Sequence, residues 1–109
     1  MAAHAEAEGK VATALYVVIE AKPDEGEEVA EFLRQSKALV DAEPGATAWF
    51  SIQFGPTTFA IFGAFPDEAG RQAHLSGKVP ASLFAKAGYL LAAPPTIHKA
   101  DVLASKLPG

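Results

Sequence analysis

The sequence contains no cysteine, and few of its residues are basic. Without cysteine the chain can form neither a disulfide nor a thiolate nucleophile, and it cannot bind zinc or an iron–sulfur cluster through sulfur. Nine lysines and arginines stand against thirteen aspartates and glutamates, which gives a net charge of −4. Nucleic acids and anionic membranes bind clusters of positive charge, so we expect neither as a partner.

Long hydrophobic runs are missing as well. The apolar stretch over residues 11–19 is too short to span a bilayer and stops at Glu20. The chain starts MAAHAEAEGK, which lacks the basic segment and following apolar segment of a signal peptide. We therefore expect a cytoplasmic protein in which residues 1–11 form a flexible tail.

Apolar side chains, in contrast, are abundant: hydrophobic residues make up 50% of the 109 residues. This length fits a single domain over residues 1–109, with its folded part at residues 12–106. So small a domain has too little interior to bury this much apolar surface. An exposed apolar face on a small domain usually marks a contact with a partner, which favours a homodimer.

The expected elements follow the order strand, helix, strand, strand, helical segment, strand. β-Branched and aromatic runs alternate with stretches of helical period. The ranges are a strand at 13–22, a helix at 23–45, a hairpin at 46–65, helical pieces at 66–77 and 79–95, and a strand at 96–105. This βαββαβ order is typical of the ferredoxin-like α+β fold, in which helices cover one face of a four-stranded antiparallel sheet.

Two local features sharpen this prediction. Asp24 and Glu27 have the spacing of a capping pair at the start of the first helix. Gly55 and Pro56 separate the two strands of the hairpin. We expect Gly55 to take the positive φ that a type II′ turn requires of its first central residue.

Both faces of the expected strands carry large apolar side chains. Leu15 alternates with Tyr16 in the first strand, and Phe50 alternates with Trp49 in the second. Because the helices cover only one face, the other apolar face needs a second sheet, and the simplest source is another copy of the chain. We therefore expect a homodimer that forms through the sheet face.

The chain resembles the antibiotic biosynthesis monooxygenase family over about Thr13 to Lys106. Four segments in a fixed order carry the resemblance: KPDEGEEVAEFL, DAEPGATAWF, FPDEAGRQAHLSG and AAPPTIHKADVLAS. The resemblance implies a dimeric α+β barrel, in which two sheets pack face to face and each subunit keeps a small pocket. Some members oxidise polycyclic phenols or quinols with molecular oxygen and without metal or flavin, so it also implies a small aromatic ligand, no metal and no cofactor.

His74 is the candidate catalytic residue. It titrates near neutrality, so it can take or share a phenolic proton. Gly70 lies one helical turn earlier and leaves room beside the ring for a ligand or a close strand. The alternative is a structural histidine that hydrogen-bonds between helix and sheet.

Five further residues are candidates for binding the substrate. Trp49 and Phe62 offer aromatic surface, while Tyr16 and Ser51 can donate hydrogen bonds to substrate oxygens. His98, a second titratable group on the last strand, is the fifth candidate; the alternative, which the sequence favours, is an exposed strand histidine without such a role. Trp49 also suits a place at the dimer contact, where tryptophan is enriched.

The resemblance favours a cofactor-independent monooxygenase acting on a small quinol or polyphenolic compound. The alternative is a non-catalytic small-molecule-binding or stress-related dimer. A related group with the same fold degrades haem, using a histidine after the third strand, an asparagine on the first strand and a tryptophan on the third. This chain has no asparagine and its one tryptophan lies on the second strand, so haem degradation is the least favoured reading.

Overall fold

The computed structural model describes residues 11–108 and contains four strands and three helices in that range. The expected tail lies, except for Val11, outside the described residues. The elements are β1 (Thr13–Glu20), α2 (Gly26–Asp41), β2 (Ala48–Gln53), β3 (Thr58–Phe65), α3 (Glu68–Leu75), α4 (Lys78–Leu90) and β4 (Thr96–Asp101). None of these helices combines the length and the apolar character needed to cross a membrane.

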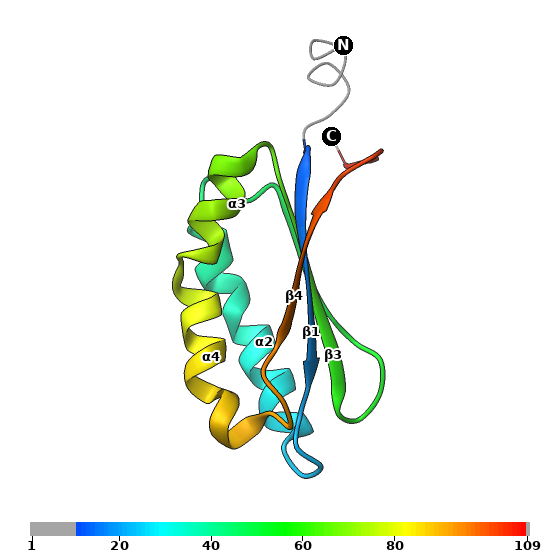
Figure 1. Ribbon diagram of the computed structural model, residues 1–109, viewed down its shortest axis with the longest axis vertical. Helices are drawn as coiled ribbons and strands as arrows, with labels where there is room; N and C mark the ends of the chain where they lie inside the picture. The colour runs from blue at the N-terminus through cyan, green and yellow to red at the C-terminus, as the bar shows by residue number, and fades with distance from the viewer. Residues whose placement is uncertain (1–10, 109) are drawn as a thin grey trace.

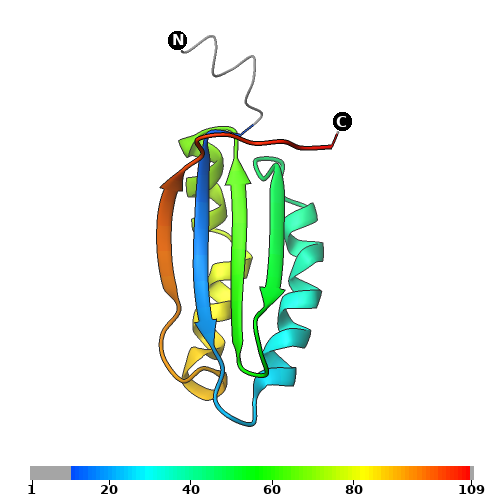
Figure 2. The same ribbon diagram turned by 90° about the vertical axis from the view of Figure 1, so that its right-hand side faces the viewer.

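The strands form one antiparallel sheet in the order β2-β3-β1-β4, with the two central strands sharing the longest register. All three helices lie on one face of the sheet, and the other face is bare in the single chain (Figure 1). Figure 2 looks onto that bare face, where β4, β1, β3 and β2 run side by side. The expected ferredoxin-like α+β fold is confirmed.

The core fills the space between the sheet and the helices. Leu15, Val17 and Ile19 of β1 point to the helix side and are buried. Phe59 and Ile61 of β3 lie opposite them in the register and are also buried. Burying a side chain of this size contributes about 1.5–3 kcal/mol, so this layer holds the helices to the sheet.

The opposite face of the sheet carries a second apolar layer, as the alternation of the strands indicates. Tyr16 of β1 pairs with Phe62 of β3, which in turn pairs with Phe50 of β2. Phe50 is 56% exposed and Ile52 is 44% exposed, both on an edge strand. This surface, which we call the outer face, is the one that the sequence assigned to a second copy of the chain.

The capping pair expected at the start of the first helix is wrong. Residues 22–25 form a turn instead, closed by a 2.9 Å hydrogen bond from the Glu25 N–H to the Lys22 carbonyl. Asp24 belongs to this turn, and Glu25 occupies the N-cap position without a side-chain hydrogen bond. The helix starts only at Gly26, where a side chain would meet the Pro56 carbonyl oxygen at 2.0 Å.

The expected turn geometry of the hairpin is also wrong. The φ of Gly55 lies outside the left-handed region, so the connection is no type II′ turn. Instead four residues, 54–57, join the strands, and the Phe54 N–H donates to the Thr58 carbonyl at 2.8 Å. The longer loop removes the need for a positive φ that a two-residue connection imposes.

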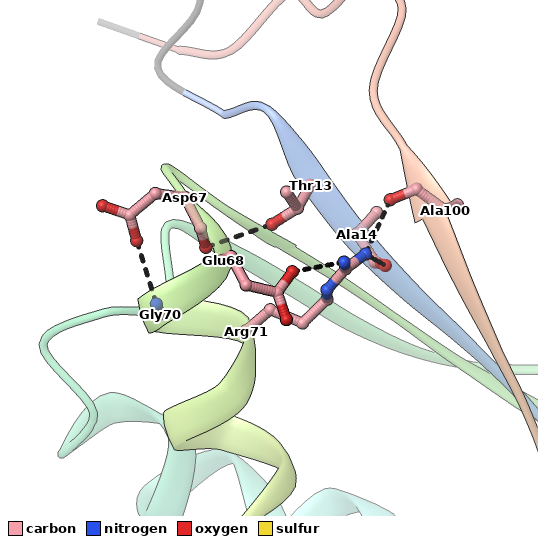
Figure 3. Close-up of polar contacts among 7 residues, drawn as sticks. All are labelled: Thr13, Ala14, Asp67, Glu68, Gly70, Arg71 and Ala100. Atoms are coloured by element: carbon pink, nitrogen blue, oxygen red, sulfur yellow. Dashed lines mark hydrogen bonds and ion pairs between the residues drawn. The ribbon is translucent and has the colours of Figure 1, made fainter.

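Helix α3 is attached to the sheet by a polar cluster (Figure 3). Its N-cap Asp67 accepts a hydrogen bond from the Gly70 N–H at 2.9 Å. Arg71 donates from Nη1 to the carbonyls of Ala14 and Ala100 at 3.2 and 3.0 Å, and it pairs with Glu68. Because Ala14 and Ala100 lie on β1 and β4, this one guanidinium joins the helix to two strands.

Candidate functional site

His74 lies near the end of α3 and is buried, with 6% of its surface exposed. Its Nδ1 lies 2.6 Å from the Oε1 of Glu43, which belongs to the loop between α2 and β2. The Phe65 ring packs against the imidazole at a centroid distance of 5.4 Å. In a partly buried carboxylate–imidazole pair of this length, the carboxylate can orient the ring and share a proton with it.

Two glycines let this pair form. A side chain on Gly70 would lie 2.7 Å from the carbonyl oxygen of Gly45, so α3 and the loop pass each other in direct backbone contact. The room beside Gly70 is therefore filled by the chain itself and holds no ligand. This close approach brings Glu43, two residues before Gly45, within reach of His74.

A groove of about 550 Å³ runs between α2 and β2 beside this pair. Trp49, Phe50 and Ser51 line it from the strand, and Glu43 lines it from the loop. Its remaining walls are mainly helix side chains, which are Leu33, Arg34, Lys37, Val40 and Asp41. The volume falls within the range of about 300–1,000 Å³ that is usual for small-molecule sites.

A second void touches His74 from the other side but is far smaller. It has a volume of about 20 Å³ and an apolar lining that includes Leu15, Ile61, Leu83 and Ile97. A space of this size holds about one water molecule. The void is thus smaller than an aromatic substrate or a haem.

The predicted site residues separate onto the two faces of the sheet. Trp49 and Ser51 share the helix side, as their alternation indicates, and both line the groove. Tyr16, Phe62 and His98 are neighbours on the outer face, where the Tyr16 and His98 rings lie 6.1 Å apart. The single chain thus brings Trp49 and Ser51 to the Glu43–His74 pair, and keeps the other three away from it.

Glu43 is the residue that sequence reasoning missed. It lies in the segment DAEPG, whose acidic and turn-forming residues are typical of a helix end. Its partner His74 is 31 positions away, so no local period connects them. The close contact between Gly45 and Gly70 is the physical reason for the pairing.

The indole of Trp49 carries an unusual polar atom. Its Nε1–H is buried, and no acceptor among residues 11–108 receives it. The ring itself packs on the core next to Gly63 of β3. Leaving such a donor unpaired costs about 1–3 kcal/mol.

Within the described part of the chain, no cluster of three or more histidines and acidic residues is arranged to hold a metal ion.

Comparisons with known proteins identify the fold. No family model matches the chain, and no curated protein matches it. The structure of PA3566 from Pseudomonas aeruginosa has 22% identity and a TM-score of 0.74, and the match covers 86% of this chain and 96% of that one. A structure described as an antibiotic biosynthesis monooxygenase has 17% identity and a TM-score of 0.72, covering 84% and 98%. The fold is that of the antibiotic biosynthesis monooxygenases, and the predicted resemblance is confirmed at this level.

A more similar structure is that of the NE2512 protein from Nitrosomonas europaea, which is described as a protein of unknown function. It is 51% identical to this chain, with a TM-score of 0.89, and the match covers 92% of this chain and 97% of that one. The chain belongs to the same family as the NE2512 protein.

Proposed function

We propose that this protein is a cofactor-independent monooxygenase that oxidises a small quinol or polyphenolic compound with molecular oxygen. One observation carries the proposal: Glu43, whose carboxylate lies 2.6 Å from His74, lines a groove that Trp49 lines with an aromatic ring. The groove offers stacking surface for an aromatic substrate, and the pair offers a proton acceptor. The shared fold with proteins named monooxygenases supports this reading.

The chemistry needs no external reductant. A quinol that has lost its phenolic proton can pass an electron to oxygen. One oxygen atom then enters the ring and the other leaves as water with two hydrogens of the quinol, so the product is a hydroxyquinone. The quinol supplies all the electrons that oxygen takes up. The protein has to desolvate the substrate, favour its anion and limit the access of water.

We also propose that the protein works as a homodimer joined through the outer face. In the single chain Phe50 and Ile52 are exposed beside Tyr16 and Phe62. A second sheet packed on this layer would bury it. In the dimer Tyr16, Phe62 and His98 lie in the contact, apart from the groove.

Oxygen uptake with a panel of anthrones, naphthoquinols and catechols tests the proposal. We expect uptake with at least one quinol, and a loss of at least tenfold in His74→Ala that retains its fold by circular dichroism. Gln35→Ala is the matched control, because Gln35 is exposed on α2 and lies outside the groove. Uptake that is absent with every compound, or unchanged in His74→Ala, contradicts the proposal.

A non-catalytic small-molecule-binding dimer is the second candidate. The observation that favours it is the small void at His74, because the imidazole there ties α3 to the loop as a structural group would. Calorimetric binding of a quinol without any oxygen uptake would select this candidate.

A further inference from the structure

We infer that the group which meets the substrate hydroxyl is the carboxylate of Glu43, and that His74 is a positioning residue behind it. The inference rests on the proposed function, since it assigns roles within the same groove. It reverses the order that the sequence suggests, where the histidine acts directly. The substrate class that follows is an aromatic compound with a free phenolic hydroxyl as hydrogen-bond donor.

Access separates the two members of the pair. The Glu43 side chain is 22% exposed and lines the groove of about 550 Å³. The His74 side chain is 7% exposed and lines the void of about 20 Å³, and it is not part of the groove lining. A ring that stacks on Trp49 in the groove can therefore reach Glu43, whereas His74 lies behind the carboxylate.

The two oxygens of Glu43 have different surroundings. Oε1 is engaged by Nδ1 of His74 at 2.6 Å. Oε2 lies beside Gly77, 3.3 Å from the point where a side chain would begin, and receives no hydrogen bond from residues 11–108. Oε2 is thus the atom that remains for a donor on the ligand.

The charges of the groove favour a hydrogen-bond donor on the ligand at this position over an anionic group. Lys37 pairs with Asp41 at 2.6 Å, and Arg34 pairs with Glu31 at 3.2 Å. Glu43 has only the imidazole as a partner among the described residues. A phenolic O–H can donate to such a carboxylate in a charge-assisted hydrogen bond, which is stronger than a bond between neutral groups.

The proton transfer follows from this contact. The phenolic O–H bond breaks, the proton forms a new O–H bond on Oε2, and the electron pair stays on the phenolic oxygen. His74 keeps its proton on Nδ1 and donates it to Oε1 throughout, which holds the carboxylate in place. Carboxylates act as general bases toward much weaker acids when the resulting anion is stabilised.

Isothermal titration calorimetry with two matched ligands tests the assignment on the full chain. We expect 1-naphthol to bind at least about tenfold more tightly than 1-methoxynaphthalene, because the ether has no O–H to donate and a tenfold preference corresponds to about 1.4 kcal/mol for the lost hydrogen bond to a charged acceptor. Glu43→Gln should lose most of this preference. Glu28→Gln, which removes an exposed carboxylate of α2 outside the groove, should keep it.

Two variants of His74 test whether His74 positions the Glu43 carboxylate or only stabilises the fold. His74→Asn keeps an N–H where Nδ1 lies and should retain the preference for 1-naphthol, while His74→Leu should lose it. Both variants are compared only if circular dichroism shows that they are folded, and His74→Leu provides the test if Glu43→Gln fails to fold. Equal binding of the two ligands by the wild-type protein, no binding of 1-naphthol, or an unchanged preference in Glu43→Gln or His74→Leu overturns the inference.

Oxygen uptake measured in parallel distinguishes this inference from the proposed function. A Glu43-dependent preference without any turnover overturns the monooxygenase and leaves the binding role of Glu43. Turnover that survives Glu43→Gln unchanged overturns the role of Glu43 and leaves the monooxygenase.

Discussion

Glu20 at the end of β1 holds the start of β3 through both of its carboxylate oxygens. Thr57 Oγ1 donates to Oε2 and Thr58 Oγ1 donates to Oε1, each at 2.7 Å. These bonds favour the ionised carboxylate, and the hydroxyl of Thr58 is the larger cause that lowers the pKa of Glu20 below 4.5. Glu20, for which the sequence predicts no function, thus links the two central strands at one end.

The stability of the protein should depend on the ionisation of Glu20. Because its pKa is lower in the folded than in the unfolded chain, the stabilisation is complete above about 4.5 and is lost as the pH falls through the folded value. Urea unfolding at pH 7 and at pH 3 should show a smaller acid loss in Glu20→Gln than in the wild type. Thr58→Val should reduce the acid loss in the wild type but not in Glu20→Gln, and equal effects in both backgrounds would contradict this account.

The unpaired indole N–H of Trp49 leads to a second prediction at this scale. Trp49→Phe removes a buried donor that has no acceptor among the described residues, which offsets the loss of apolar contact. We expect its free energy of unfolding to lie within about 1 kcal/mol of the wild type. Trp49→Ala loses the packing without this compensation and should cost at least about 2 kcal/mol. Urea unfolding followed by circular dichroism measures both, and a Trp49→Phe loss as large as that of Trp49→Ala would show that the N–H is satisfied.

Among the elements, α3 is the one whose placement determines the site. Its N-cap at Asp67, the guanidinium of Arg71 and the contact of Gly70 with Gly45 fix it against β1, β4 and the loop. The Glu43–His74 pair depends on this placement, because its members come from two different segments.

Gly70→Ala should therefore lower the free energy of unfolding by about 1–3 kcal/mol, because the new methyl group must displace the Gly45 carbonyl. Gly88→Ala is the matched control: Gly88 is exposed on α4, and nothing lies within 4 Å of the added atom. There alanine should raise the stability by about 0.5–1 kcal/mol, since it favours the helix more than glycine does. Urea titrations of the two variants measure this difference, and equal effects would mean that the close approach is not constrained.

The period of apolar residues in the sequence predicts the helices and strands, because burial is periodic along each of them. It does not predict features that depend on contacts between distant parts of the chain. Alternation correctly places Trp49 and Ser51 on one side of β2. It cannot say which face of the sheet that side becomes, so the sequence predicts one site for Trp49, Tyr16 and Phe62, although Tyr16 and Phe62 lie on the other face. The end of a strand or helix likewise depends on its partner: β4 stops at Asp101 because its partner strand β1 begins at Thr13.

The candidate site was predictable only in part, for the same reason. His74 stands out by its residue type, and Trp49 stands out as the sole tryptophan. Glu43 is one of thirteen acidic residues, and only the approach of two backbones distinguishes it. A contact between segments 31 positions apart leaves no local pattern to read.

At the scale of the whole molecule, the sheet is covered on one side only (Figure 1). The bare outer face carries exposed Phe50 and Ile52, an unusual amount of apolar surface for so small a chain. This asymmetry is the physical basis of the proposed homodimer.

Ile52→Lys should convert the dimer to a folded monomer. The side chain is 44% exposed in the single chain, so lysine costs little there, but in the dimer it would bury an unpaired charge. Sedimentation velocity should show a dimer for the wild type and for the control Gln35→Lys on the outer side of α2, and a monomer for Ile52→Lys. A wild-type protein that sediments as a compact monomer at low concentration would remove the dimer from the proposal.

The sole tryptophan of the chain lines the groove, and this gives the protein a built-in optical probe. Its intrinsic fluorescence comes from one indole at one site, so any change of emission on adding a ligand reports on the surroundings of that ring. An aromatic compound stacked there should quench the emission, whereas a compound bound only at the bare sheet should leave it unchanged. Competing candidate ligands can thus be ranked in dilute solution without label or turnover.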